Sequence, residues 1–249
     1  MIRFEAIDLY FNRGLPSEVK ALDNISLELS QGSFTLLIGS NGSGKSSLLN
    51  LLAGTVRQDN GSIYFQGSEI SKLADFKRSA FISRIFQNPM QGTAPEMTLL
   101  ENFRLAALRD GNRRLFTGLN AGFRRQVAEK VSRLGMGLEQ RLDQKMGSFS
   151  GGQRQALSLL MATWCDTSVL LMDEPTAALD PASAALVFNL ARSLVHEKGI
   201  TCLMVTHNLK QCLQAGTRLI QFTEGRIKHD LSGAEKERLS FTELAAWFA

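Results

Sequence analysis

The segment Gly-Ser-Asn-Gly-Ser-Gly-Lys-Ser has the residue types and the spacing of a phosphate-binding loop. It matches the pattern GxxxxGK[ST] at every fixed position. Its glycines let the backbone curl so that several N–H groups point at one anion, while the lysine and the last serine can reach outer phosphates and Mg²⁺. The candidate phosphate-binding residues are Gly39, Ser40, Asn41, Gly42, Ser43, Gly44, Lys45, Ser46 and Ser47. We therefore predict a nucleoside triphosphate site, with Lys45 taking part in catalysis and Ser46 as a ligand of the metal.

The segments on both sides of this loop are those that such a site requires. Phe34–Ile38 is a continuous apolar run, typical of a buried parallel strand, and Ser47–Ala53 has the pattern of the first turns of a helix. The N-terminus of that helix would add a partial positive charge beside the anion. With both flanks present, a glycine-rich turn in an ordinary α/β unit is the weaker interpretation.

Two adjacent carboxylates, Asp173 and Glu174, follow the apolar run Val169–Met172 and precede Pro175. Successive side chains of a strand point in opposite directions, so the two acids can serve different purposes. We expect Asp173 to hold Mg²⁺, commonly through water, beside Ser46, and Glu174 to act as the general base on the attacking water. Two solvated acids at a strand end are the alternative, and the continuous apolar strand before them argues against it.

Two more polar residues stand at predicted strand ends. Gln87 follows an apolar stretch that ends at Phe86, and His207 follows the predicted strand 200–206. An amide can ligate the metal and orient water, and an imidazole can donate a hydrogen bond to the γ-phosphate. Strand carboxyl ends of an open parallel sheet face one crevice, so we predict that both residues join the same catalytic site. The other two histidines lack this placement, and we interpret them as structural.

The segment Ser150-Gly151-Gly152-Gln153 opens a predicted helix that ends near Trp164. Ser150 is a suitable N-cap, which is the purely structural interpretation. The two glycines also expose backbone N–H groups at a helix N-terminus, which favours a second anion site. Two such sites far apart in the sequence suggest a nucleotide that is shared between them.

The composition is that of a soluble globular protein of 249 residues, with 44% apolar and 21% charged residues. The net charge of +4 is too small to indicate nucleic acid as a partner, and we expect none. Three cysteines without metal-ligand spacing, Cys165, Cys202 and Cys212, predict free thiols in a reducing compartment. We find no signal peptide and no uncharged apolar run near the ~20 residues that span a bilayer. The sequence thus predicts a cytosolic chain that reaches a membrane only through a partner.

The order of patterns along the chain predicts three regions. Alternating segments at 2–11, 19–29 and 62–67, with a turn at 59–61, indicate a small antiparallel β layer beside a parallel core. Further expected elements are helices at 99–108, 123–134, 181–197 and 239–248 and a hairpin of 218–222 with 226–229. A basic connection containing Arg109, Arg113, Arg114, Gly118 and Gly122 is either a contact surface or, more commonly, a solvated face.

The chemistry-bearing segments together resemble the ATP-binding cassette (ABC) ATPases, and the resemblance covers essentially the whole chain. The segments are Gly39–Ser46, Gln87, Phe149–Gln153, Val169–Glu174, Ala177–Asp180 and His207. The resemblance implies an α/β fold of the P-loop NTPase class, a RecA-like mostly parallel sheet with an antiparallel β subdomain and an inserted α-helical subdomain. We expect a single domain, 1–249, in which 1–86 and 166–249 form the ATP-binding core and 87–165 the helical subdomain.

The resemblance also implies a head-to-tail homodimer with two ATP molecules at its interface. Ser150, Gly151, Gly152 and Gln153 of one subunit would cover the ATP held by Lys45 of the other. Tyr10 falls where the family stacks an aromatic ring on adenine, although Phe11 is adjacent and equally available, and Asp180 falls in a loop that contacts the second subunit. Phe149 stands where the family usually has leucine and Ala177 where it usually has serine, and neither change removes a catalytic group.

By this resemblance the chain is a Mg²⁺-dependent ATPase subunit of a membrane transporter, held at the cytoplasmic face of the inner membrane by a separate permease. Met90, Glu96, Met97 and Glu101 would line the groove that receives a permease helix. A short cassette without a fused membrane segment favours a bacterial importer with an extracytoplasmic substrate-binding protein, and segments 86–93 and 225–248 favour amino-acid-type cargo. The alternatives are a soluble ABC ATPase in cofactor assembly, translation control or DNA repair, and a nucleotide sensor without turnover.

Overall fold

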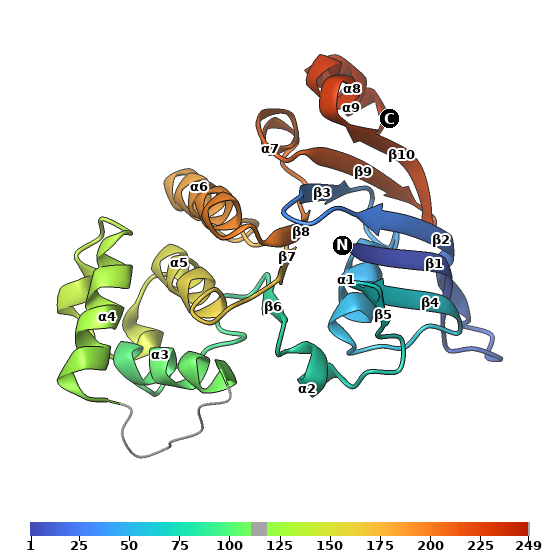
Figure 1. Cartoon of the computed structure of the whole chain (residues 1–249). Coiled ribbons are helices and arrows are strands. Elements are labelled where there is room, and N and C mark those ends of the chain that lie inside the picture. The colour runs from blue at the N-terminus through green and yellow to red at the C-terminus, as the bar shows by residue number, and fades with distance from the viewer. Residues whose placement is uncertain (111–118, 249) are drawn as a thin grey trace.

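The computed structural model describes residues 1–110 and 119–248, which form two β-sheets (Figure 1). The smaller sheet is antiparallel, with the strand order β2-β1-β4-β5. Its strands are β1 (Ile2–Phe11), β2 (Val19–Leu29), β4 (Asn60–Phe65) and β5 (Ser68–Glu69). Buried and more exposed residues alternate along β1 and β2, as expected for strands that pack on one face. The predicted antiparallel layer is confirmed.

The larger sheet has the order β10-β9-β3-β8-β7-β6, and its neighbours pair in parallel except for β10 and β9. Its strands are β3 (Phe34–Ile38), β6 (Ile82–Ile85), β7 (Val169–Asp173), β8 (Thr201–Val205), β9 (Arg218–Thr223) and β10 (Arg226–Ser232). β3 and β8 are buried along their whole length. The carboxyl ends of β3, β8, β7 and β6 follow one another along one edge of the sheet, which is where ligands of such sheets bind.

Helices cover both faces of the larger sheet. α1 (Lys45–Ala53) packs against both sheets, and four of its leucines are fully buried. In Figure 1, α3 (Leu99–Ala107), α4 (Ala121–Ser132) and α5 (Gly151–Ala162) gather on one side of the molecule, with α6 (Pro181–Lys198) beside them. The remaining helices are α2 (Asp75–Arg78), α7 (Leu209–Gln214), α8 (Gly233–Arg238) and α9 (Phe241–Ala246), and 3-10 turns lie at Leu108–Asp110, Leu138–Gln140 and Met146–Ser148.

The larger sheet separates two hydrophobic cores. Leu36 and Ile38 of β3 belong to the core that contains residues of α3, α4, α5 and α6, whereas Leu37 belongs to the core shared with α1 and the antiparallel sheet. This division follows from the strand period of two, which directs neighbouring side chains to opposite faces. The phosphate-loop segment is therefore attached to a strand that is held from both sides.

Gly61 is the first place where the structure differs from the sequence prediction. Instead of a turn at 59–61, β4 already begins at Asn60, and Gly61 has φ 85° inside the strand. The register with β1 shifts between Glu5 and Asp8, and a Cβ on Gly61 would lie 2.3 Å from the Glu5 carbonyl oxygen. The glycine marks a β-bulge, which shares its sequence signal with a turn.

The C-terminal segment is the second difference. The helix predicted for 239–248 is present but shorter, because Leu239 is extended with ψ 120° and α9 spans Phe241–Ala246, and the preceding helix α8 was not predicted. Ser240 starts α9 through a capping box with Glu243. This cap sets the start of α9 two residues after the predicted start.

The position of Arg109 differs from the solvated face that was predicted for the basic connection. Its guanidinium is half-buried and donates to Ser83 Oγ (2.8 Å) and the Ile82 carbonyl oxygen (3.2 Å), so it is not part of a solvated face. Gly122 lies in α4, while Arg113, Arg114 and Gly118 lie outside the described residues.

The three cysteines are free and buried, as predicted. None of the helices among the described residues is both long and apolar enough to cross a bilayer.

Candidate functional site

The loop between β3 and α1 requires glycine at two positions. Gly39 has φ 143°, and a Cβ there would lie 2.2 Å from the carbonyl oxygen of Phe222. Gly44, directly before α1, has φ 106°, and its Cβ would lie 2.6 Å from the carbonyl oxygen of Ala21. Any larger residue would both strain the backbone and collide with a neighbouring strand. The glycines therefore fix the path of the loop against β9 and β2.

Lys45 places a buried cation inside this loop. Its side chain is 5% exposed, and Nζ donates to the carbonyl oxygens of Gly39 (2.9 Å) and Ser40 (2.8 Å) and to Ser43 Oγ (3.3 Å). Burial lowers the pKa of Lys45, and the negative charges of Glu174 and Asp173 oppose that shift. The described hydrogen-bond acceptors of the ammonium are all neutral, so a phosphate entering the loop would meet a cation without a directly bonded counterion.

Ser46 and Asp173 lie in contact although they are far apart in the sequence. Ser46 Oγ donates to Asp173 Oδ1 over 3.0 Å. Asp173 ends β7, two strands away from β3, and this topology brings the carboxylate to the start of α1. The pair predicted to hold the metal is thus in place at the carboxyl edge of the sheet.

Arg84 and Asn50 also belong to this contact network, and the sequence did not indicate them. One terminal nitrogen of Arg84 donates to Asn50 Oδ1 (2.6 Å) and the other pairs with Asp173 Oδ2 (3.4 Å). Arg84 stands opposite Leu171 in the β6–β7 register, next to a strand with an acidic end. An arginine in a short, mostly buried strand was the available signal.

Glu174, His207 and Gln87 form a second cluster at the same edge. Glu174 Oε1 lies 2.9 Å from His207 Nε2, and Gln87 Nε2 reaches Glu174 Oε2 at 3.5 Å. The backbone of Glu174 has φ 47° and its N–H donates to the carbonyl oxygen of Val205 (3.1 Å). The left-handed conformation, with this bond to β8, directs the carboxylate between the two partners.

The residues present fit a Mg²⁺ ion. No cluster of three or more His, Cys, Asp or Glu suited to a metal occurs in the described part of the chain. Any cation held by Asp173 would therefore take its other ligands from the Ser46 hydroxyl, an amide oxygen of Gln87, phosphate and water, which are the hard oxygen donors that Mg²⁺ prefers. The Lys45 ammonium bonds to the Gly39 carbonyl oxygen and not to Asp173. The side-chain oxygens of Asp173 and Ser46 therefore form the pair that would bind the ion.

Three predicted nucleotide-binding features lie outside these two clusters. Ser150 caps α5 through a capping box with Gln153, and Asp180 caps α6 by accepting from the N–H groups of Ala182 and Ser183. A side-chain hydrogen bond from Ser183, together with these backbone bonds, lowers the pKa of Asp180. The ring of Tyr10 has Arg13 and Lys20 within about 5 Å, and the neighbouring Phe11 is 39% exposed.

The predicted permease groove is only partly supported by the contacts of its residues. Met90 is 39% exposed. Glu101 is engaged in the capping box of α3, accepting from Thr98 N (2.7 Å) and Thr98 Oγ1 (2.8 Å), and Glu96 pairs with Lys145 (2.9 Å). The Glu96 side chain is nevertheless 86% exposed, so acidic as well as apolar residues of this surface remain accessible to a partner.

Comparison with known proteins agrees with this geometry. The family model described as ABC transporter matches residues 22–177. A tyrosine transport ATP-binding protein of Clostridioides difficile is 41% identical over 91% of this chain and 90% of the relative. A probable branched-chain amino acid transport ATP-binding protein, LivG, of Methanocaldococcus jannaschii is 32% identical over 95% of this chain and 91% of the relative.

Solved structures give the same result. The ATP-binding cassette MJ1267 of an ABC transporter aligns with a TM-score of 0.81 and 29% identity, covering 100% of this chain and 99% of that chain. A dimeric post-hydrolysis state of the cassette MJ0796, bound to ADP and Pi, aligns with a TM-score of 0.79 and 26% identity, covering 93% and 98%. The P-loop NTPase fold is thereby confirmed, and the chain belongs to the ABC transporter family as one of its ATPase subunits.

Proposed function

We propose that Glu174 is the general base of ATP hydrolysis and that His207 and Gln87 orient it. The observation that carries this proposal is the cluster itself: one carboxylate, with an imidazole at 2.9 Å and an amide at 3.5 Å, on three adjacent strand ends beside the phosphate loop. A carboxylate that is fixed on both oxygens can accept a proton from a water without reorienting. When nucleotide is bound, His207 would donate a hydrogen bond to the γ-phosphate.

The phosphate loop and β7 would supply the binding part of the site. The N–H groups of the loop and the Lys45 ammonium would hold the phosphates, with Ser46 and Asp173, and Gln87 through its amide oxygen, as ligands of Mg²⁺. Mg²⁺, when bound, would neutralise the negative charge that the phosphates develop during transfer. Tyr10, or Phe11 beside it, would stack on the adenine ring.

We also propose that two copies of the chain enclose the nucleotides. Ser150, Gly151, Gly152 and Gln153 of one copy would face the loop of the other, with Asp180 at the same interface. Support comes from a solved cassette, MJ0796, whose structure is dimeric. Residues 87–165, which include α3, α4 and α5, would form the helical subdomain, and 1–86 with 166–249 the nucleotide-binding core.

The biological role that we favour is solute import through a separate permease at the cytoplasmic face of the membrane. Relatives named for tyrosine, branched-chain amino acid and xylose/arabinose transport match nearly their whole length. A macrolide export relative, MacB, is 34% identical and is matched over 34% of its length. Amino-acid-type cargo and a substrate-binding protein are the finer part of this proposal, and a soluble, non-transport ABC ATPase is its alternative.

Replacing the base is the direct test of the catalytic proposal. Glu174→Gln keeps the shape of the side chain but cannot accept the proton, so we expect ATP binding to remain, turnover to fall by about 10²-fold or more, and an ATP-bound dimer to accumulate. Radiolabelled ATP binding, phosphate release and size-exclusion chromatography measure the three quantities.

Glu224→Gln is a matched control, because Glu224 also has a left-handed backbone (φ 48°) but is exposed in the turn between β9 and β10. It should hydrolyse ATP at the parent rate. Parent-like turnover of Glu174→Gln would remove Glu174 from the role of base.

A further inference from the structure

Arg84 lies between the helix that follows the phosphate loop and the strand that ends at Asp173. Its terminal nitrogens contact Asn50 of α1 and Asp173 of β7, and its guanidinium carbon lies 4.8 Å from the centre of the Phe86 ring. The side chain is 16% exposed and that of Asp173 is 18% exposed, so water screens the pair only partly. Arg84 therefore connects the phosphate-loop helix, the acidic end of β7 and the segment that leads to Gln87.

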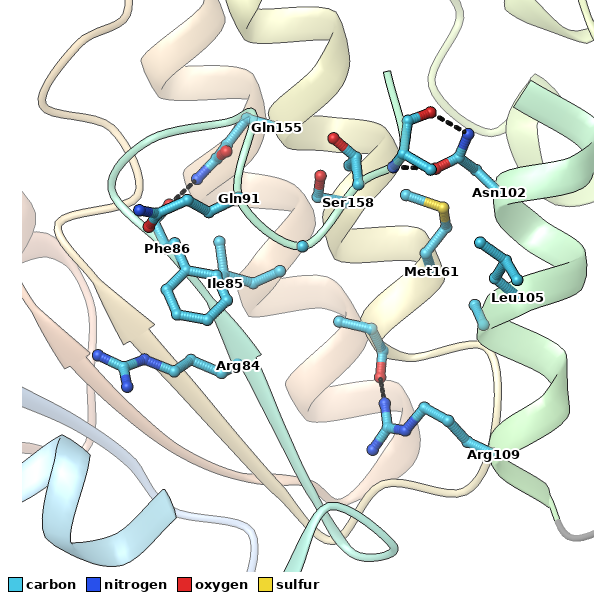
Figure 2. A pocket seen from close by; sticks show the side chains of 15 residues that line it. Arg84, Ile85, Phe86, Gln91, Asn102, Leu105, Arg109, Gln155, Ser158 and Met161 are labelled. Atoms are coloured by element: carbon cyan, nitrogen blue, oxygen red, sulfur yellow. Dashed lines mark hydrogen bonds between the residues drawn. The ribbon is translucent and has the colours of Figure 1, made fainter. Parts of the chain in front are cut away.

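Arg84 and Phe86 also line a cavity of about 400 Å³ beside β6. Other lining residues come from α3 and α5, and among them Ser158 is buried with an Oγ that has no hydrogen-bond partner. Figure 2 shows the Arg84 guanidinium pointing away from Ser158, Met161 and Leu105 on the far side of the cavity. The guanidinium of Arg84 thus contacts the Asp173 carboxylate and does not point into the cavity.

The contacts of Asp173 show what Arg84 can do for it. Oδ1 accepts from Ser46 and Oδ2 pairs with Arg84, so each carboxylate oxygen has its own partner. The Ser46 hydroxyl would turn to the metal when Mg²⁺ binds, which leaves Arg84 as the described side-chain contact that still fixes the carboxylate plane. A guanidinium holds such geometry because it is planar and Asn50 fixes its other nitrogen.

We propose that Arg84 is a positioning residue of the ATPase reaction, which holds the Asp173 carboxylate toward the metal and at the same time weakens the attraction of that carboxylate for the metal. This inference rests on the proposed role of Asp173 as a Mg²⁺ ligand. It predicts that loss of Arg84 raises the affinity for the metal and lowers kcat, because the charge and the orienting contacts of the side chain act separately.

Arg84→Met removes both contributions. The lost positive charge near Asp173 should make a divalent ion bind about threefold to tenfold more tightly to the nucleotide complex. The freed carboxylate should lower kcat by about tenfold, because the metal and the phosphates lose their alignment with Glu174. A role limited to folding would not tighten metal binding.

Arg84→Lys separates the two contributions. The ammonium keeps the charge, so metal affinity should stay within about twofold of the parent. It cannot contact Asn50 and Asp173 with a planar fork, so kcat should still fall. Arg109→Met is the control: it removes another half-buried guanidinium that lines the same cavity, but one whose described bonds go to carbonyl oxygens and a hydroxyl.

The experiment measures Mn²⁺ binding to the ADP complex by electron paramagnetic resonance of free Mn²⁺, together with kcat at saturating Mg²⁺. Tighter Mn²⁺ binding with reduced kcat in Arg84→Met, and reduced kcat alone in Arg84→Lys, support the proposal. Arg84 variants that match Arg109→Met in both quantities overturn it. Asp173→Asn tests the underlying assignment: unchanged Mn²⁺ affinity in that variant would show that Asp173 is not a ligand, whatever Arg84 does.

Discussion

Among single residues, Lys130 on α4 links protonation to the stability of the fold. Its Nζ donates to the carbonyl oxygen of Thr163 (3.3 Å) and lies 4.7 Å from the Trp164 ring centre, two contacts that favour the charged amine. Burial, together with the positive charges of Lys198 and Arg133, nevertheless lowers the pKa of Lys130 to about 8. The folded state therefore releases this proton at a lower pH than the unfolded chain does.

The lowered pKa of Lys130 predicts that its contribution to the free energy of unfolding rises with pH. Between about pH 8 and the ordinary Lys value of 10.5, the unfolded chain holds a proton that the folded chain has lost, so deprotonation favours folding. Below pH 8 both states are protonated and the folded state bears the full cost of the buried charge. After allowance for the partial exposure of Lys130, we expect a change of about 1–2 kcal/mol across this window.

The measurement compares thermal unfolding of the parent and Lys130→Met at pH 7.5, 8.5 and 9.5. The rise of Tm with pH should be smaller in Lys130→Met by about 2–4 °C. Lys145→Met is the control, because Lys145 is exposed and pairs with Glu96 at the surface. Equal slopes in the parent and Lys130→Met would mean that Lys130 keeps an ordinary pKa in the folded protein.

At the scale of elements, the start of α5 packs on the start of α6 without room for a side chain at Gly152. A Cβ on Gly152 would lie 2.3 Å from Ser183 Oγ and 2.5 Å from Ser183 Cβ, whereas one on Gly151 would meet only Leu179 Cδ2 at 3.6 Å. Ser183 is in the first turn of α6, directly after the Asp180 cap. The segment Ser150–Gln153 and the cap of α6 at Asp180 are therefore closely packed against each other.

Gly152→Ala should lower the free energy of unfolding by about 1–3 kcal/mol, because either helix must shift to admit the methyl group. Gly151→Ala should leave stability unchanged or raise it slightly, because alanine favours a helix and has space. Urea unfolding of both variants measures the difference. Equal stability of the two would show that Ser183 moves aside at little cost.

Sequence patterns predicted those elements whose chemistry is local. The phosphate loop, the strand before Asp173 and the Ser150 cap each carry their signal within a few residues, and the structure contains all three elements. The helix α8 was not predicted, and the bulge at Gly61 was missed because an Asn-Gly pair fits a turn and a bulge equally. Arg84 was missed because its meaning depends on β6 pairing with β7, a contact between distant segments.

At the scale of the whole molecule, exposed apolar side chains on α3 and after Gln87 offer a surface for the proposed permease. Met90 is 39% exposed and Leu105, which lines the cavity, is 45% exposed. Both lie near the loop that carries Gln87, so a partner seated there would lie close to the catalytic cluster. Isolated exposed apolar residues are ordinary, but Leu105 is set apart by lining the cavity that Phe86 also lines.

Leu105→Arg should therefore abolish co-purification of a polytopic membrane protein in a mild-detergent pull-down from native membranes, while the ATPase rate of the isolated chain stays at the parent level. Mass spectrometry identifies the partner in the parent sample. Phe241→Arg, an equal change at a 52% exposed position on α9, should keep the partner. Recovery of soluble partners alone by the parent chain would favour the soluble, non-transport alternative.

The left-handed backbone of Glu174 has a consequence for how this protein can be evolved. Glutamate is unfavourable at φ 47°, and glycine or asparagine would adopt that conformation at lower cost. A library screened only for survival of heat would accordingly enrich changes at position 174 that relax the chain and remove the base. Thermostability and turnover are opposing selection pressures at this residue, so any directed evolution of this ATPase must score activity in every round.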